Sequence, residues 1–233
     1  MTKGLEHMLI SGVDEAGRGS VLGPLVIAGV SVDENDLHKL VSLGVKDSKL
    51  LSPKKREKLA IEIRSIALIC HVLFLSPAEI DVVVERNRKL HKLNRLEAQA
   101  MAKVISILKP DVIYVDASDV LAERFGEHIA ENLDFSPRIV SEHKADTTYP
   151  IVSAASIIAK VERDRVISQL QKKHGNIGCG YPSDPITIKF LEDWITQFGA
   201  YPDFVRKSWK TAKRLKCRFD SRQKTLFRLS PDL

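Results

Sequence analysis

Four acidic residues in three separated segments carry the clearest chemical potential of this chain. Asp14 and Glu15 are adjacent and follow the apolar run "MLISGV", Asp116 ends "VIYVD", and Asp146 lies in "HKADTTYP", just before a predicted helix. Functional groups of open α/β sheets gather at strand ends and connecting loops, so three distant segments can bring four carboxylates together. We therefore expect these residues to form one acidic site.

A divalent metal is the natural partner of such a site. Packed carboxylates raise one another's pKa unless a cation neutralises them. Oxygen ligands without any His or Cys pattern favour Mg²⁺ or Mn²⁺ over zinc. Two such ions about 3.5 to 4 Å apart can activate water and stabilise the leaving oxygen of a phosphodiester. Taken singly, each acid also fits a solvated turn or a helix cap, and spacing alone leaves both interpretations open.

The adjacency of Asp14 and Glu15 sets a geometric condition. Consecutive side chains of a regular strand point to opposite faces of the sheet, so both cannot chelate one ion from a regular strand. Either the strand bends at Glu15, or Glu15 reaches the metal through water or its own carbonyl. The glycines that follow in "GVDEAGRGSVLGP" favour a bend.

The glycines also leave the backbone on both sides of Arg18 accessible to a ligand. Gly17 and Gly19 add no side chain there, and Arg18 is a cation that can contact phosphate. The G-x-G-x-x-x-G spacing is not the dinucleotide fingerprint, and no Gly-Lys-Ser/Thr follows as in a P-loop. The segment is suited to holding a sugar-phosphate against metals, the alternative for Arg18 being an exposed turn.

Strands should carry the first of these acids and helices should surround them. Apolar runs predict neighbouring strands in "MLISGVDEAG" and "GPLVIAGVSVD", and a third in "IALICHVLFLS". Ser52 and Pro53 predict the start of a helix. Apolar residues at intervals of three or four predict an amphipathic helix that stops at Pro110; they are Leu93, Leu96, Ala100, Val104 and Ile107. This helix leads into the strand "VIYVDAS", which implies a parallel crossover and a mixed sheet.

The second half of the chain reads as helical and basic. One helix should begin near Ser153 and end at Gly175, and another should cover "TIKFLEDWITQFG". From Arg206 onward, "RKSWKTAKRLKCRFDSRQKTLFR" holds ten Lys or Arg and one acid, a pattern of a phosphate-binding surface or of a solvated helix face. We place a boundary near Gly178, with a main domain at 1–178 and a basic helical region at 179–233.

Composition narrows the class of protein. The 233 residues are 44% hydrophobic with net charge +6, which is typical of a globular chain. No apolar stretch approaches the roughly 18 residues that span a bilayer, and the N-terminus has no secretory signal, so we expect a cytoplasmic protein without membrane contact. Three distant cysteines, Cys70, Cys179 and Cys217, fit neither a disulfide framework nor a zinc site and should be reduced. Nothing requires more than a monomer.

Seven segments of the chain together resemble ribonuclease HII, and most closely its archaeal members. They occur in the family's order over nearly the whole chain: "VDEAGRGSVLGPLV", "KDSKLLS", "NRLEAQAM", "VIYVDAS", "KADTTYPIVSAASIIAKVERD", "GCGYPSDP" and "VRKSWKT". The resemblance implies a ribonuclease H-like α/β fold, with a mixed five-stranded sheet flanked by helices and a C-terminal helical region that assists duplex binding. It also implies an endonuclease with two Mg²⁺ or Mn²⁺ ions that hydrolyses the RNA strand of RNA/DNA hybrids. The same enzyme would nick duplex DNA 5′ to an embedded ribonucleotide, leaving 3′-hydroxyl and 5′-phosphate ends.

The resemblance also assigns residues. The catalytic, metal-binding acids would be Asp14, Glu15, Asp116 and Asp146. The residues that sense the ribonucleotide would be Gly17, Arg18, Gly19 and Tyr181. Exposed backbone groups of the glycine-rich segment can bind a 2′-hydroxyl, and Tyr181 could pack on the sugar beyond it. Candidates for phosphate contact are Lys46, Ser48, Lys49 and Lys144, with a surface role as the alternative. Cys179 stands where the family usually has another small residue.

The remaining interpretations concern single residues, a partner and rival functions. We interpret Asp164 as a member of a local ion pair and His143 as a surface residue. "QKTLFRL" lacks the paired aromatic residues of a good sliding-clamp motif, so a clamp is only a possible partner. Rival functions are another ribonuclease H-like nuclease such as a resolvase, a hybrid-binding protein without activity and, least favoured, a small-molecule nucleotide binder. "GRG" and "GYPSDP" argue against the resolvase, and the complete set of acids argues against the inactive binder.

Overall fold

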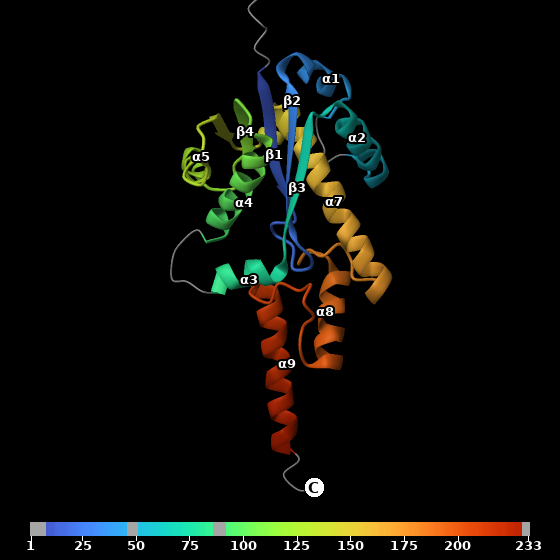
Figure 1. Ribbon diagram of the computed structural model, residues 1–233. Helices are drawn as coiled ribbons and strands as arrows, with labels where there is room; N and C mark the ends of the chain where they lie inside the picture. The colour runs from blue at the N-terminus through green and yellow to red at the C-terminus, as the bar shows by residue number, and fades with distance from the viewer. Residues whose placement is uncertain (1–7, 46–50, 86–91, 230–233) are drawn as a thin grey trace, which may run out of the picture.

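A five-stranded mixed sheet forms the centre of the protein. The computed structural model describes residues 8–45, 51–85 and 92–229, with side chains described as far as residue 222. The strand order is β3-β2-β1-β4-β5, in which β1 pairs antiparallel with β2 and parallel with β4 (Figure 1). The strands are β1 (Leu9–Ala16), β2 (Leu25–Asp33), β3 (Ile69–Leu75), β4 (Val112–Asp116) and β5 (Arg138–Glu142). The predicted mixed five-stranded sheet is thus confirmed.

Helices cover both faces of the sheet. On one side, α7 (Pro150–His174) packs on β1 and β2 together with α1 (Leu37–Ser42) and α2 (Pro53–Ile66), and on the other side lie α4 (Lys92–Leu108) and α5 (Ala122–Ala130) (Figure 1). The remaining helical segments are η1 (Glu34–Asp36), α3 (Pro77–Glu85), α6 (Ala145–Thr148), α8 (Pro185–Phe198) and α9 (Lys210–Leu229).

The alternation of side chains along β2 explains the two cores. Val26 and Val30 pack in the core beneath α7, whereas Leu25 and Ile27 pack in the core beneath α4, as the two-residue period of a strand requires. Gly12 of β1 allows α7 to lie very close, because a Cβ atom there would be 2.5 Å from the backbone of Ile151. The start of α7 is therefore fixed directly against β1.

Several predicted boundaries need correction. Helix α7 begins at Pro150 rather than near Ser153, because proline suits the first turn of a helix. The predicted amphipathic helix ends at Leu108, and Ile107 is half exposed, since its neighbours Ile105 and Leu108 take the buried face. Ser52 does cap α2, as expected. The three cysteines are unpaired, and Cys179 and Cys217 are exposed.

The C-terminal helices pack on the loop that follows β1. Backbone hydrogen bonds join Val21 N to Gly180 O (2.8 Å) and Gly23 N to Phe204 O (2.8 Å). A third hydrophobic core contains Val21 and Leu22 together with Leu191 and Val205. The glycine-rich loop therefore lies between the sheet and the helices below it (Figure 1).

Candidate active site

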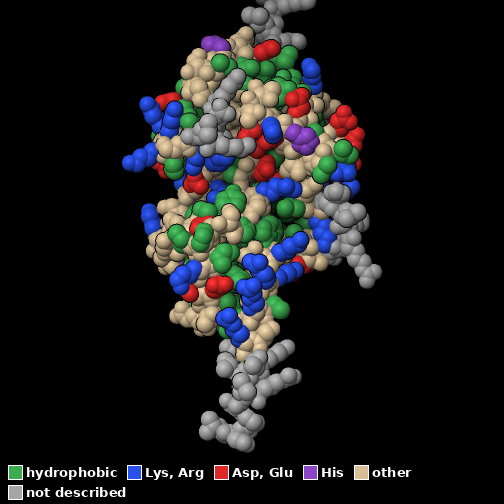
Figure 2. Space-filling view, turned by 180° about the vertical axis from the view of Figure 1, so that it is seen from behind, with side chains coloured by type: hydrophobic (Ala, Val, Ile, Leu, Met, Phe, Trp, Pro, Cys, Tyr) green, Lys and Arg blue, Asp and Glu red, His purple; other side chains and the backbone are tan. Residues whose placement is uncertain are grey.

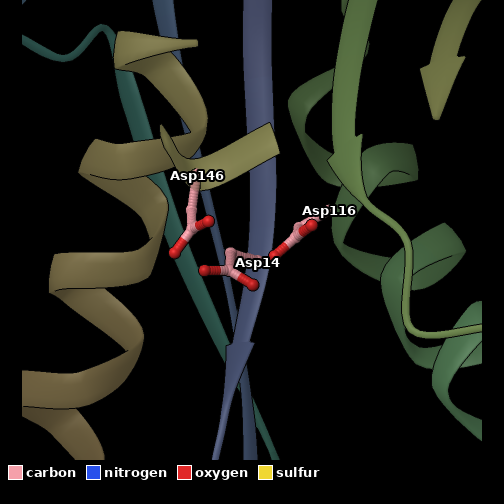
Figure 3. A group of neighbouring side chains, drawn as sticks. All are labelled: Asp14, Asp116 and Asp146. Atoms are coloured by element: carbon pink, nitrogen blue, oxygen red, sulfur yellow. The ribbon is translucent and has the colours of Figure 1, made fainter. Parts of the chain in front are cut away.

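Three of the four predicted acids form a compact group. Asp14 lies near the end of β1, Asp116 is the last residue of β4, and Asp146 lies in α6 just before α7. One carboxylate oxygen of each lies within 4.8 Å of the others (Figure 3). The backbone N–H of Ala145 donates to Asp116 Oδ1 (3.1 Å), which ties α6 to β4. The carboxyl ends of two parallel strands and the start of a helix thus bring together three acids that are far apart in the sequence.

Glu15 lies beside this group rather than within it. Strand β1 stays paired with β2 through Glu15 and Ala16, so the predicted bend at Glu15 is wrong, and the chain turns only at Gly17, where φ is +87°. Neighbouring side chains of a regular strand leave it on opposite faces, yet the carboxyl groups of Glu15 and Asp14 still interact, because each shifts the pKa of the other. Its Oε2 atom is buried and has no hydrogen-bond partner among the described residues.

Burial and like charges perturb the titration of these acids. Burial raises the pKa of Asp14, and the nearby cation Lys160 and the hydroxyl of Ser156 only partly offset it. Burial raises the pKa of Glu15 well above its usual value, and the negative charges of Glu97, Asp14 and Asp116 raise it further. Closely packed acids that resist ionisation in this way are the ligand set that a hard divalent cation would neutralise.

A cavity of about 470 Å³ opens over the acids. The residues that line it include all four acids, the three residues of the "GRG" segment and Tyr181. A Cβ atom at Gly19 would lie 4.0 Å from the Tyr181 ring, its nearest neighbour. The structure therefore brings the predicted metal-binding and substrate-binding residues of these motifs to one cavity.

The side chain of Arg18 is held by α4. Its Nε donates to Glu97 Oε2 (2.8 Å) and its Nη2 donates to Asn94 Oδ1 (2.6 Å). Glu97 is fully buried and also accepts a hydrogen bond from Ser118 (2.8 Å). The guanidinium of Arg18 is thus hydrogen-bonded within the protein, to two residues of α4.

Arg206 holds the same loop from the C-terminal side. Its side chain is completely buried and donates to the carbonyls of Arg18 (2.8 Å) and Gly23 (3.1 Å). Burial, aided by the charge of Arg163, lowers the pKa of Arg206 to about 10. Arg206 was expected in the basic surface and is not part of it, because these carbonyls bind it inside the protein.

Sequence reasoning missed three basic residues of the cavity. Arg56 of α2 and both Lys160 and Arg163 of α7 line it. A signal for two of them was available, since the buried face of α7 carries polar residues at helical intervals of three and four: Ser153, Ser156, Lys160 and Arg163. Asp164 does form an ion pair as expected, but its closer partner is Arg56 of another helix (2.9 Å), with Arg163 at 3.7 Å.

The remaining predicted residues lie elsewhere. Lys144 is exposed, precedes α6 with φ of +58°, and does not line the cavity. His143 is exposed as expected and its ring contacts the carbonyls of Ala117 and Val120. Three predicted phosphate contacts lie outside the described residues: Lys46, Ser48 and Lys49.

Comparison with known proteins identifies the family. The family model described as Ribonuclease HII matches residues 11–212. The chain belongs to the ribonuclease HII family. A ribonuclease HII of Thermococcus sibiricus is 51% identical over 210 residues, which cover 89% of this chain and 91% of the relative.

Two solved structures give the same result. The ribonuclease H2 of Pyrococcus horikoshii OT3 is 46% identical with a TM-score of 0.84, over 91% of this chain and 99% of that chain. A PCNA:RNase HII complex from Archaeoglobus fulgidus contains a chain with 46% identity and a TM-score of 0.80, over 88% of this chain and 96% of that chain. The fold is therefore the ribonuclease H-like fold.

Family membership establishes the enzyme class. The protein is a ribonuclease H, an endonuclease that cleaves the RNA strand of RNA/DNA hybrids and requires a divalent metal. Within the described residues, no helix is both long and apolar enough to cross a membrane.

Proposed function

We propose that this ribonuclease HII also nicks duplex DNA on the 5′ side of an embedded ribonucleotide, by hydrolysis that uses two divalent cations and leaves 3′-hydroxyl and 5′-phosphate ends. The observation that carries the proposal is the cavity itself. Its acids, Asp14, Asp116 and Asp146, lie beside the backbone of Gly17 to Gly19 and the ring of Tyr181. One cavity can therefore hold a phosphodiester and also test the sugar beside it.

The four acids are proposed to hold the cations. Asp14 lies between the other two members of the compact group and is suited to bridge two ions, while Asp116, Asp146 and Glu15 complete the ligand shells (Figure 3). The buried Oε2 of Glu15, which no described residue satisfies, fits a ligand role. When bound, such ions activate a water and stabilise the leaving oxygen. Mg²⁺ and Mn²⁺ are both suited to this set of oxygen ligands.

The glycine-rich loop is proposed to recognise the 2′-hydroxyl through its backbone. Gly17 and Gly19 present no side chain to the ligand, and the Arg18 guanidinium is bound by Glu97 and Asn94. Ser20 donates to the carbonyl of Gly17 (2.9 Å), and Arg206 donates to that of Arg18, so the loop is held in one shape before the ligand arrives. A preorganised backbone can both donate to and accept from a 2′-hydroxyl. Tyr181 would pack on the next sugar.

Region 179–233 is proposed to grip the duplex. Figure 2 shows Lys and Arg side chains gathered over the C-terminal helices at the lower half of that face. Exposed basic residues of α9 and of the segment just before it include Lys207, Lys210, Lys213, Arg214, Arg218 and Arg222. Such a surface binds backbone phosphates without reading sequence. Lys144, with Lys46, Ser48 and Lys49, would add further phosphate contacts.

The broader biological setting is part of the same proposal. The Archaeoglobus fulgidus relative is found in a complex with PCNA, and this supports a sliding clamp as a possible partner here. The protein would act as a monomer, since one chain supplies all the residues of the cavity. We also retain the cytoplasm as the proposed location.

The proposal is tested with a DNA duplex that contains one ribonucleotide. The protein is incubated with it in Mg²⁺, in Mn²⁺ and in a chelator, and Asp116→Asn serves as the inactive control. Metal-dependent nicking that the substitution abolishes supports the proposal. Cleavage of a uniform RNA/DNA hybrid without any nicking of this duplex would contradict it, and tight binding of both without cleavage would indicate an inactive hybrid-binding protein.

A further inference from the structure

A buried arginine lies behind the two segments assigned to ribonucleotide recognition. Arg163 of α7 is 5% exposed and lines the active-site cavity. Neither the acidic group nor the proposed hydrolysis uses it. Burying a guanidinium is costly unless its donors are paired, yet the Nε atom of Arg163 has no hydrogen-bond partner among the described residues. The contacts that it does make explain why it is there.

Arg163 supports the loop that carries Tyr181. Its Nη2 donates to the carbonyl of Cys179 (2.8 Å), and its guanidinium carbon lies 4.5 Å from the centre of the Tyr181 ring. A guanidinium over an aromatic face is attracted to the ring, and more strongly where water is excluded. One side chain therefore fixes both the backbone before Tyr181 and the plane of its ring.

The same side chain also limits the position of the glycine-rich loop. A Cβ atom at Gly17 would lie 2.8 Å from both Cδ and Nε of Arg163, and one at Gly180 would lie 3.1 Å from Nη2. Both glycines have positive φ, +87° and +85°. The backbone just before Arg18 and the backbone just before Tyr181 thus both approach Arg163 at distances that only glycine permits.

Only arginine fits this combination of contacts. Its planar guanidinium can stack on a ring and donate in its own plane at the same time, whereas a lysine ammonium is a compact charge without a face to stack. Arg56 also lines the cavity, and its guanidinium is bound by Asp164 and by the carbonyl of Leu51. Of these two arginines of the cavity, Arg163 is the one whose guanidinium lies over the Tyr181 ring.

We propose that Arg163 is a positioning residue that fixes the spacing between the Tyr181 ring and the backbone of Gly17 to Gly19, and that this spacing sets the preference for a ribonucleotide followed by a deoxyribonucleotide over a uniform hybrid. The inference rests on the proposed function, because it assigns the selectivity of the same cavity. Arg163 acts through Tyr181 and the loop, not on the reacting phosphate.

The test is a ratio of two rates. The value of kcat/KM is measured on a duplex with one ribonucleotide and on a uniform RNA/DNA hybrid, for wild type, Arg163→Met, Tyr181→Ala and the double variant. Arg56→Met is the matched control, because it removes a charge from the same cavity without touching Tyr181. Thermal unfolding of each variant shows whether it is folded. If Arg163→Met does not fold, Arg163→Lys is used in its place.

The expected result is a selective loss. Arg163→Met should lower the ratio of single-ribonucleotide to hybrid cleavage by about tenfold, the scale of a desolvated cation–π contact, and the double variant should fall no further than Tyr181→Ala. Arg56→Met should lower both rates alike and leave the ratio unchanged.

Two results would overturn the inference. One is an equal loss on both substrates in Arg163→Met and Arg163→Lys, which would make the residue merely structural. The other is independent, multiplicative effects of Arg163→Met and Tyr181→Ala. A wild-type protein that cuts the hybrid but never the single-ribonucleotide duplex would instead overturn the proposed function, and this inference with it.

Discussion

The Arg18 guanidinium donates to the buried carboxylate of Glu97 across 2.8 Å, so the cation in the glycine-rich loop is bound to α4. The bond joins two segments 79 positions apart, and it holds the loop while leaving its backbone toward the cavity. An arginine between two glycines suggests a phosphate contact from sequence, and the structure shows in addition that its guanidinium is hydrogen-bonded to Glu97 and Asn94 of α4.

Two substitutions of Glu97 should distinguish the effect of its hydrogen-bond acceptor from the effect of its negative charge. Glu97→Ala removes the acceptor for Arg18 and Ser118 and should lower the free energy of unfolding by about 1.5 to 3 kcal/mol, the usual contribution of a hydrogen bond to a charged group, and cleavage should fall with it. Glu97→Gln keeps an acceptor and should retain most of both. Chemical denaturation and a cleavage assay check this, and equal losses in the two variants would show that charge, not position, is what matters.

Gly19 and Gly17 should respond differently to a methyl group. Gly19 has no atom within 4 Å of an added Cβ except the Tyr181 ring edge at 4.0 Å, so Gly19→Ala should change stability by less than about 0.5 kcal/mol while it obstructs the cavity and lowers cleavage. Gly17→Ala meets Arg163 and has φ of +87°, and it should lose stability as well. Melting temperature and cleavage rate are measured for both. A stable and fully active Gly19→Ala protein would argue against backbone recognition at this position.

Asp184 should make the Tyr181 loop sensitive to acid. It caps α8 and accepts hydrogen bonds from Cys179 N (2.6 Å) and Ile186 N (3.0 Å), and the bond from Cys179 is the main reason that its pKa falls to about 2. Because the folded pKa lies below the unfolded value near 4, this stabilisation is complete above pH 4 and is lost as pH falls toward 2. Asp184→Asn should remove that part of the pH dependence. Unfolding measured from pH 6 to pH 2 tests it, and an unchanged profile in the variant would refute the assignment.

Divalent cations should stabilise the protein through its acids. Burial raises the pKa of Asp14 and Glu15, so in metal-free protein stability should decrease as pH rises above the ordinary values near 4, because the unfolded chain then ionises more readily. Mg²⁺ or Mn²⁺ at about 100 times the dissociation constant should add roughly 2.7 kcal/mol. Asp14→Asn should abolish most of this gain. Melting with and without metal at several pH values is the measurement, and a gain that survives in the variant would place the cations elsewhere.

How far the sequence predicts this structure depends on where each residue lies. The acids Asp14, Asp116 and Asp146 come at the ends of elements, and element ends can be found from apolar patterns. Strand β5 (Arg138–Glu142) escaped notice because it is a short, half-buried edge strand with weak alternation.

Residues that reach the site from the middle of helices were harder to predict. Glu97 and Arg163 are charged residues of ordinary helical sequence, and only the fold shows that they are buried beside the loop. Arg206 lies in a basic stretch of the sequence, yet two backbone carbonyls bind its guanidinium inside the protein. Such partners are distant in sequence, so no local pattern reveals them.

The most direct test of the account uses three duplexes that differ at one sugar. A single position carries a ribonucleotide, a 2′-O-methyl ribonucleotide or a deoxyribonucleotide, and the products are mapped in the presence of Mg²⁺ and Mn²⁺. We predict one cut, on the 5′ side of the ribonucleotide, with 3′-hydroxyl and 5′-phosphate ends and no cut in the other two duplexes. Cleavage of the 2′-O-methyl or deoxyribonucleotide duplex, or binding to the ribonucleotide duplex without cleavage, would contradict recognition of the 2′-hydroxyl beside a metal-binding acidic site.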